Sequence, residues 1–278
     1  MTTVDLRQAI NAVSDVVQNR PRPLREFDQI YMKTGDMVLQ SELIASWAKN
    51  KRIAFIGDGD AISVCIAYLQ GREVLDFGPS QITVFDFDER IVQAVKRFAD
   101  AEQLHHLTAQ LYNCFDPFPD YAAFDCFYTN PPWGAYNNGE SAIVFLQRGM
   151  EALHFSGDGV IVIADDEELA WPREVLANVQ KYVCDRGFFV SRLQPKLHSY
   201  HLDDAPELQS CNLFISSLPT VQSGRVQSQA ITDPRRLENF YGRSKVPRVR
   251  YIREKKRLDY GKAHDDEYKL ELLETLHD

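Results

Sequence analysis

The chain has 278 residues, 44% of them hydrophobic, and a formal net charge of −9 at pH 7, which is ordinary for a globular protein with a full core. No apolar run reaches the ~18 residues of a membrane span, and no basic region followed by an apolar stretch marks a secretory signal. Five cysteines without a Cys-x-x-Cys pair, and histidines without a matching set of ligands, predict reduced thiols in the cytoplasm and no metal site.

The charge is unevenly distributed along the chain. Residues 224–262 contain twelve Lys and Arg against four Asp and Glu, a local charge of +8, so the remainder carries −17. An acidic body binds nucleic acid poorly but suits a small polycation such as a polyamine. The basic segment leaves open a contact with nucleic acid, and a homo-oligomer is also left open.

The order of the predicted elements is typical of an α/β protein. A leading helix over residues 4–17 and a second over residues 37–47 precede the first strand. Strands and helices then alternate, which predicts a doubly wound, mostly parallel Rossmann-like sheet. The expected strands cover residues 52–57, 81–86, 108–113, 124–129 and 159–164, and the expected helices cover residues 62–70, 89–103, 140–153 and 172–186.

Two later strands have no helical pattern between them. Residues 187–193 and 211–217 therefore predict an antiparallel hairpin that closes the sheet. The connection over residues 194–210, which carries Tyr200 and Asp204, is long enough to act as a substrate lid.

The pattern weakens after the hairpin. Residues 220–265 are expected to pack lightly or to be mobile, and a short helix is expected within residues 265–278. The chain therefore divides into a helical lead (1–50), a cofactor-binding catalytic domain (51–219) and a basic, partly irregular tail (220–278).

A glycine turn after the first strand carries the first functional signal. Four apolar residues end abruptly at Gly57-Asp58-Gly59-Asp60, and a helix start follows. Glycines let backbone N–H groups approach a nucleotide-like ligand at this place in an α/β sheet. Asp58 and Asp60 would repel a pyrophosphate but attract a sulfonium and an amine. The turn therefore predicts a site for an S-adenosylmethionine-type cofactor.

Polar residues at the ends of the next two strands extend this site. Asp86 ends the second strand, where an acid can hold ribose hydroxyls, while Asp88 could cap the following helix. Asn113 ends the third strand and could accept a hydrogen bond from the adenine amino group, with Asp116 as the alternative.

A polar group precedes the first strand. Asp28, Tyr31 and Thr34 stand together in the sequence there. They could fold over the amino-acid end of the cofactor, and Tyr31 is the expected contact.

The fourth strand ends in Asn130-Pro131-Pro132-Trp133. The prolines stiffen a turn at the ligand-binding edge of the sheet and leave carbonyls exposed as acceptors. An amine could donate its N–H bonds to Asn130 and to a backbone carbonyl, which would aim its lone pair at the cofactor's electrophilic carbon. Trp133 offers a stacking or cation–π face. Asn130, Pro131 and Trp133 are therefore expected to be catalytic.

Together these motifs resemble the class I S-adenosylmethionine-dependent transferases, particularly the amino-methyltransferases. From Pro23 to about Leu218 the chain is also similar to the branched-chain polyamine synthases. That resemblance implies transfer of aminopropyl groups from decarboxylated S-adenosylmethionine to a polyamine nitrogen. The matching motifs are Glu26-Phe27-Asp28-Gln29, Gly57-Asp58-Gly59-Asp60, Asp86-Phe87-Asp88-Glu89-Arg90, Pro117-Phe118-Pro119-Asp120-Tyr121 and Arg148-Gly149.

Two positions depart from the pattern of that family, which has acids where this chain has Gly59 and Asn130. Polyamine nitrogens are protonated at neutral pH, so aminopropyl transfer needs a carboxylate to take a proton and hold the cation. Asp60, Glu140 and Asp166 are the candidates for this role.

Three functions stay open. Aminopropyl transfer to a polyamine is favoured. The second function is methylation of an amino group, such as adenine in nucleic acid, because a neutral nitrogen needs only the Asn130 acceptor and residues 133–140 could hold a flipped base. The third is a non-catalytic cofactor-fold protein whose basic tail binds RNA or a partner.

Overall fold

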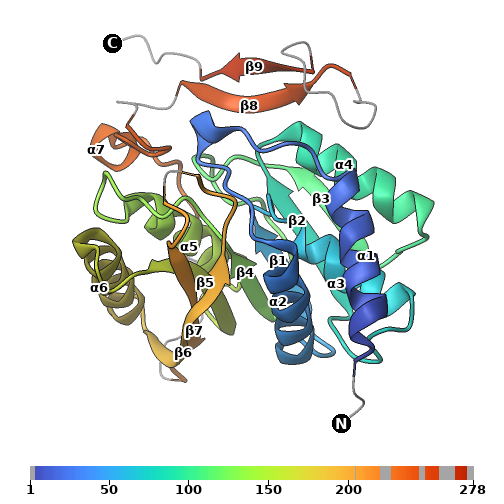
Figure 1. Cartoon of the computed structure of the whole chain (residues 1–278). Helices are drawn as coiled ribbons and strands as arrows, with labels where there is room; N and C mark the ends of the chain where they lie inside the picture. The colour runs from blue at the N-terminus through green and yellow to red at the C-terminus, as the bar shows by residue number, and fades with distance from the viewer. Residues whose placement is uncertain (1–3, 204, 220–226, 244–247, 257–266, 274–278) are drawn as a thin grey trace.

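A seven-stranded sheet forms the centre of the computed structural model, which describes residues 4–203, 205–219, 227–243, 248–256 and 267–273 (Figure 1). The strands are β1 (Arg52–Ile56), β2 (Gln81–Asp86), β3 (Leu107–Leu111), β4 (Cys126–Thr129), β5 (Asp158–Asp165), β6 (Phe188–Ser199) and β7 (Gln209–Ser217). Their order is β3-β2-β1-β4-β5-β7-β6, in which β1 to β5 run parallel and β7 is antiparallel to both neighbours. The predicted doubly wound sheet with a closing hairpin is confirmed.

Helices cover both faces of this sheet. They are α1 (Leu6–Asn19), α2 (Thr34–Trp47), α3 (Ile62–Gly71), α4 (Glu89–Ala101), α5 (Glu140–Ala152), α6 (Ala170–Asp185) and the short α7 (Pro234–Leu237), with a 3₁₀ turn, η1, at Arg25–Phe27. Helices α1 to α4 pack on one face, and α5 and α6 on the other (Figure 1). A hydrophobic core lies on each face of the sheet. In β1, Ile53 and Phe55 pack in the core under α1 to α4, and Ala54 and Ile56 pack in the core under α5 and α6, because successive strand side chains point to opposite faces.

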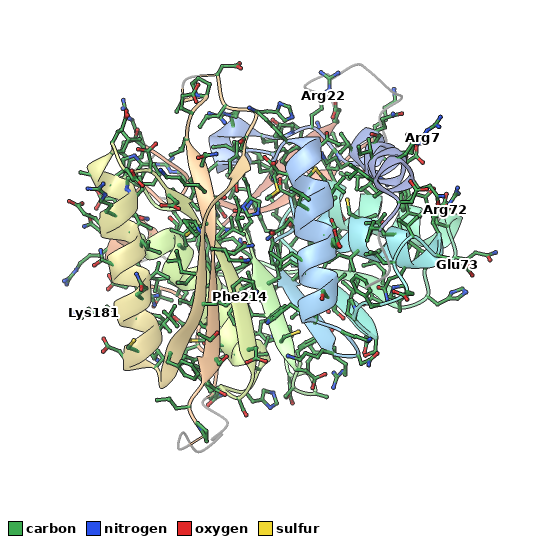
Figure 2. All side chains as sticks on the ribbon, turned by 60° about the horizontal axis from the view of Figure 1, so that its bottom comes forward. Arg7, Arg22, Arg72, Glu73, Lys181 and Phe214 are labelled. Atoms are coloured by element: carbon green, nitrogen blue, oxygen red, sulfur yellow. The ribbon has the colours of Figure 1, made fainter. Side chains whose placement is uncertain are left out.

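Charged side chains surround these layers. Figure 2 shows side chains filling the space between sheet and helices, while the exposed Arg7, Arg72, Glu73 and Lys181 extend from the periphery. All five cysteines are free thiols. Among the described residues, no helix combines the length and apolar character that crossing a membrane requires.

Two expectations for the C-terminal segment are wrong. β8 (Val249–Glu254) pairs antiparallel with β9 (Tyr268–Leu272), so the described part of the expected terminal helix contains a strand. Pairing with β8 outweighs the weak helical propensity of so short a stretch. Where they are described, the residues before β9 do not pack lightly, because Phe240 and Ile252 are fully buried. Residues 274–278 and parts of 220–265 lie outside the described residues.

The expected lid is also wrong. β6 continues through residues 194–199 and pairs with β7. Tyr200 is buried and forms an isolated bridge with Met32. The strand was not predicted because this stretch lacks the alternation of apolar and polar residues. Its buried polar residues, such as His198, hydrogen bond to other buried polar groups instead. Asp204 lies outside the described residues.

Candidate active site

A cleft opens at the edge of the sheet where β1, β2 and β4 end, which is the edge where open α/β sheets bind ligands. It encloses about 820 Å³, including open solvent at its mouth. The expected site residues that line it are Tyr31, Gly57, Asp58, Gly59, Asp60, Asp86, Asn130, Pro131 and Trp133. The structure therefore brings together most of the residues that the motifs indicate.

The glycine turn after β1 is shaped by its neighbours. Gly57 has a φ of +73°, and a Cβ there would meet the Phe145 ring at 3.0 Å, so a side chain is disfavoured twice. A Cβ at Gly59 would lie 3.2 Å from the Tyr31 ring. The Tyr31 ring packs over the turn at Gly59. This close approach favours glycine at the position where the branched-chain polyamine synthases have an acid.

Two acids, Asp58 just after β1 and Asp86 at the end of β2, hold this turn in place. The Asp58 carboxylate caps α3 by accepting hydrogen bonds from the backbone N–H groups of Ile62 (3.0 Å) and Ser63 (3.2 Å). Asp86 accepts from the N–H groups of Asp58 (3.0 Å) and Asp88 (2.9 Å). Burial and the neighbouring Asp88 raise the pKa of Asp86 to about 7, and its two N–H donors oppose that rise.

Asp60 and Asn130 form the polar end of the cleft. Asp60 Oδ1 accepts from the Met32 N–H at 2.7 Å, and Oδ2 accepts from Asn130 Nδ2 at 2.7 Å. Burial raises the pKa of Asp60, while the Arg20 guanidinium, whose Nη1 donates to the Asp60 carbonyl at 2.9 Å, lowers it. A carboxylate therefore lies beside position 130, where it is hydrogen-bonded to the Asn130 amide.

Aromatic rings flank this polar end. Trp133 packs edge-on against Tyr200, with 5.1 Å between ring centroids, and stacks near Trp171 at 6.4 Å. The indole Nε1 of Trp133 is buried and has no hydrogen-bond partner among the described residues. Such rings offer a face to a cation.

The opposite end of the cleft is aromatic and includes a residue that the motifs missed. Tyr241 stacks on Phe87 (5.6 Å between ring centroids, 14° between planes) and meets Phe27 edge-on at 5.5 Å. Its hydroxyl is buried without a hydrogen-bond partner among the described residues. An unpaired buried hydroxyl costs about 1–3 kcal/mol, so a ligand acceptor there would relieve that cost. The adjacent aromatic pair Phe240-Tyr241, in an otherwise polar segment, was the available signal.

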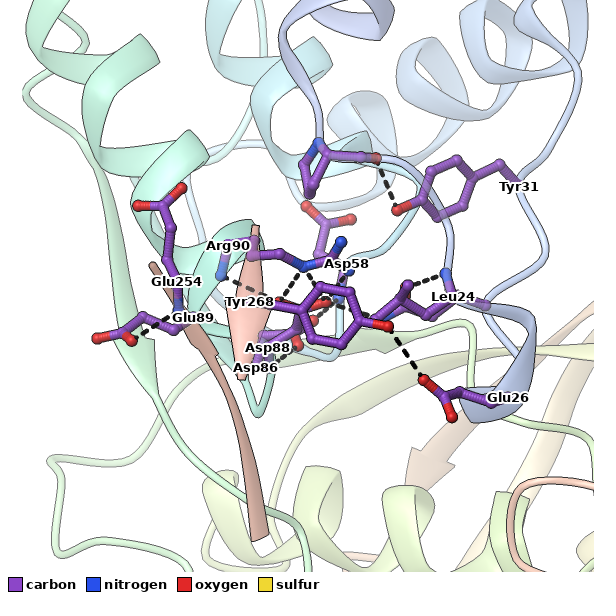
Figure 3. A network of polar contacts seen from close by, with 12 residues as sticks. Leu24, Glu26, Tyr31, Asp58, Asp86, Asp88, Glu89, Arg90, Glu254 and Tyr268 are labelled. Carbon is purple, nitrogen blue, oxygen red and sulfur yellow. Dashed lines mark hydrogen bonds and ion pairs between the residues drawn. The ribbon is translucent and has the colours of Figure 1, made fainter. Parts of the chain in front are cut away.

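A network of hydrogen bonds and ion pairs joins residues that adjoin Phe27 and Phe87 in the sequence (Figure 3). Asp88 caps α4 and binds the buried Arg90 through Nε (3.0 Å) and Nη2 (2.6 Å). The Arg90 guanidinium lies 5.1 Å from the centre of the Tyr268 ring, whose hydroxyl donates to Glu26 Oε1 at 3.3 Å. Strand β9 is thereby tied to η1 and to the start of α4, as Figure 3 shows.

The structure does not bring three expected residues into the cleft. Asn113 lies beyond the end of β3, fully buried, where its Nδ2 donates to the Arg250 carbonyl at 2.5 Å and its Oδ1 accepts from the Phe115 N–H at 2.9 Å. Glu140 begins α5 and pairs with Arg236 at 3.1 Å. Asp166 accepts backbone N–H groups just before α6. Their polar groups are committed to neighbouring elements instead.

Asp28 is the remaining acid in the cleft lining. It follows η1 in the left-handed region (φ 57°), and its carboxylate accepts no hydrogen bond from the described residues. Burial raises its pKa to about 6, and Arg25 opposes that rise. Within the described ranges, no group of three or more His, Cys, Asp or Glu side chains could hold a metal ion.

The basic tail carries ion pairs to the acidic body and within itself. Arg250 pairs with Asp116 at 3.0 Å and Arg253 approaches Glu89, while Arg253 also pairs with Glu271 of the tail at 2.5 Å. Part of the positive charge of this segment is therefore matched within the chain.

Residues 8–272 match the family described as the branched-chain polyamine synthase A C-terminal domain. The chain belongs to this family. It is 29% identical over 154 residues to the N(4)-bis(aminopropyl)spermidine synthase of Thermococcus kodakarensis, covering 54% of this chain and 41% of that protein. It is 28% identical over 187 residues to the same-named synthase of Thermus thermophilus, covering 66% and 50%. The chain thus spans about half the length of these curated relatives.

Solved structures share the fold of this chain. The C9 mutein of the Thermus thermophilus branched-chain polyamine synthase, in complex with N4-aminopropylspermidine and 5′-methylthioadenosine, superposes with a TM-score of 0.66 at 20% identity, covering 82% of this chain and 68% of that one. A proposed RNA methyltransferase of Pyrococcus horikoshii gives 0.57 at 15% identity, covering 76% and 99%. The class I methyltransferase-type fold is therefore confirmed.

Proposed function

We propose that this chain transfers an aminopropyl group from decarboxylated S-adenosylmethionine to a nitrogen of a polyamine. The observation that carries the proposal is the family match over residues 8–272. A relative of the same fold holds N4-aminopropylspermidine and 5′-methylthioadenosine, which are the kinds of product that this reaction leaves. The −17 charge of the chain outside residues 224–262 suits a polycationic acceptor.

The polar end of the cleft supplies the groups that the reacting amine needs. The amine first gives up a proton to the Asp60 carboxylate, and an N–H bond that it keeps is then accepted by Asn130 or by a carbonyl of the proline turn. Its lone pair attacks the propyl carbon next to the sulfonium, so a C–N bond forms. The C–S bond breaks with its electron pair going to sulfur, which leaves in 5′-methylthioadenosine. Holding the nitrogen in line removes part of the barrier by orientation alone.

Carboxylates in the cleft hold the acceptor's positive charge. Asp60 lies beside Asn130, and Asp28 lines the cleft with no described hydrogen bond to its carboxylate. A polyamine carries several ammonium groups, so one acid near the reacting nitrogen and another elsewhere in the cleft can each hold one of them. Asp60 is the proposed partner of the reacting amine and Asp28 of a second ammonium.

The aromatic end of the cleft suits the nucleoside of the cofactor. Phe27, Phe87 and Tyr241 form a ring-lined space beside Asp86. A flat base can stack there while its polar edge meets the unpaired Tyr241 hydroxyl.

A methyl transfer to an amino group is the second candidate function, and the neutral amide at position 130 is the observation that favours it. Calorimetric titration with S-adenosylmethionine and with its decarboxylated form separates the two. Tighter binding of the decarboxylated form, followed by a mass gain of one aminopropyl group on spermidine, supports the proposal. Tighter binding of the carboxylated form with methylated product overturns it, and binding of neither form would leave the non-catalytic alternative.

Nucleic-acid binding by the basic tail, a homo-oligomer, a cytoplasmic location and the division at residues 50 and 219 stay predictions. Retention on immobilised RNA at low salt, with and without residues 224–278, tests the first. Loss of retention on truncation would support it, and no retention of the full chain would refute it.

A further inference from the structure

A network of buried, hydrogen-bonded polar side chains runs from α2 to the cleft. His198 on β6 lies between Gln40 on α2, at 2.8 Å from its Nε2 to Gln40 Oε1, and Ser210 on β7, at 2.8 Å from its Nδ1 to Ser210 Oγ. Ser210 Oγ is also 2.8 Å from the Tyr200 hydroxyl. All four side chains are at most 2% exposed, so they satisfy one another and not water.

In this network, the donor and the acceptor of each hydrogen bond can be assigned. Gln40 Oε1 accepts from Asn212 Nδ2 at 2.8 Å, while Gln40 Nε2 donates to Asn212 Oδ1 at 2.9 Å. Because Oε1 is an acceptor, the proton of His198 lies on Nε2. Burial lowers the pKa of His198 to about 4, so the ring is neutral near pH 7 and its Nδ1 accepts from Ser210. The Ser210 oxygen then accepts from the Tyr200 hydroxyl.

This network ends beside Asn130. Tyr200 lines the cleft together with Asn130, its ring centre lies 5.1 Å from that of Trp133 on the same proline turn, and its hydroxyl interacts with the Asn130 side chain. Asn130 Nδ2 donates to Asp60 Oδ2 at 2.7 Å. With its nitrogen held by Asp60 beside the Tyr200 hydroxyl, the amide has its oxygen left for a ligand in the cleft.

We propose that Gln40, His198, Ser210 and Tyr200 are positioning residues that fix the Asn130 amide with its oxygen toward the reacting amine. An amide has a donor end and an acceptor end, and a flipped Asn130 would present N–H groups to the N–H bonds of the substrate. A carboxylate has two equivalent oxygens and needs no such orientation. The inference rests on the proposed function, because it takes an amine as the donor to Asn130.

A double-mutant cycle tests this role. Ser210→Ala removes the link to His198 and is expected to lower kcat about 10-fold when position 130 is Asn, with the affinity for the cofactor unchanged within 2-fold. In the Asn130→Asp background, where orientation no longer matters, the same substitution should lower kcat less than about 3-fold. Tyr200→Phe, which removes only a hydroxyl, should repeat this dependence on the background and serves if Ser210→Ala does not fold.

Ser41→Ala is the matched control, because this buried serine donates to the Met37 carbonyl within α2 and takes no part in the hydrogen bonds that join Gln40 to Tyr200. Its effect should be the same in both backgrounds. Equal losses for Ser210→Ala in the two backgrounds, or no loss with Asn130, would overturn the positioning role while leaving the proposed function intact. Absence of aminopropyl transfer by the unmodified chain would overturn both.

Discussion

The two ends of the cleft are built on different physical principles. At one end, the rings of Phe27, Phe87 and Tyr241 meet with centroid separations of 5.5–5.6 Å and without hydrogen bonds between them. At the other, Asp60 and Asn130 are joined at 2.7 Å in a directed hydrogen-bond network. Stacking tolerates small displacements, whereas a hydrogen bond to a reacting atom does not. Substitutions at the aromatic end should therefore change cofactor affinity, and those at the polar end should change the rate.

The largest effect is expected at the polar end. Asn130→Ala should lower kcat for aminopropyl transfer by about 10²- to 10³-fold, because the amine loses its positioning acceptor. The dissociation constant of the decarboxylated cofactor, measured by calorimetry, should stay within about 3-fold. Asn178→Ala, at an exposed asparagine that donates to the Asn138 carbonyl, is the control and should behave as the unmodified chain. A parallel fall in cofactor affinity would contradict the separation of the two ends.

The aromatic end should show the opposite pattern. Tyr241→Ala removes the ring stacked on Phe87 and should weaken cofactor binding about 50-fold, with kcat at saturation changed much less. Tyr241→Phe keeps the ring and loses only the unpaired hydroxyl, so its affinity should fall about 5-fold. Equilibrium titration of both variants gives these values. If Tyr241→Phe binds as tightly as the unmodified chain, the hydroxyl makes no bond to the base.

The difference between the ends also explains what the sequence could reveal. The glycine turn and the Asn-Pro-Pro-Trp turn each follow a strand directly, so a local pattern was enough to predict Asp58, Asp60 and Asn130 in one cleft. Tyr241 and His198 reach the site through contacts between distant parts of the chain; His198 and its partner Gln40 are 158 residues apart. No local pattern encodes such a contact.

The same reason accounts for the errors. Asn113 stands near the end of β3, yet the Arg250 carbonyl of β8 holds its amide, and β8 itself was not expected. Glu140 follows the proline turn closely, but Arg236 from the C-terminal segment pairs with it outside the cleft. The structure of the C-terminal segment was not predicted from its own sequence. Asn113 and Glu140, which interact with that segment, therefore seemed free to bind a ligand.

A pH-dependent effect is expected at Asp86, which lines the cleft. Its pKa in the folded chain, about 7, exceeds the ordinary value of 3.8, so between these values the folded state binds a proton that the unfolded state does not. Stability from this group is therefore fully present below pH 3.8 and is lost as the pH rises through 7. Relative to Asp86→Asn, the unmodified chain should lose about 2 kcal/mol of unfolding free energy between pH 5 and 7.

Urea unfolding of both proteins at several pH values measures this difference. Acids that do not interact with Asp86 are common to both proteins, so their titration cancels in the comparison. Asp185→Asn, at an exposed position on α6, is the control and should parallel the unmodified chain. A difference between Asp86→Asn and the unmodified chain that does not vary with pH would show that Asp86 is ionised in the fold throughout.

The smallest effect is expected outside both ends, where the basic segment meets the acidic body. The side chains of Arg250 and Asp116 are 41% and 30% exposed, and such a pair contributes only about 0–1 kcal/mol. Arg250→Gln should therefore lower the unfolding free energy by less than about 1 kcal/mol, and the loss should shrink at high salt because the pair is screened. Arg248→Gln, at an exposed neighbour for which no ion pair is described, should cost nothing measurable. Neither change should alter kcat or cofactor affinity. A large loss of cofactor affinity in Arg250→Gln would mean that the hold of Arg250 on Asp116 also shapes the aromatic end, and the two ends could then no longer be treated as independent of the tail.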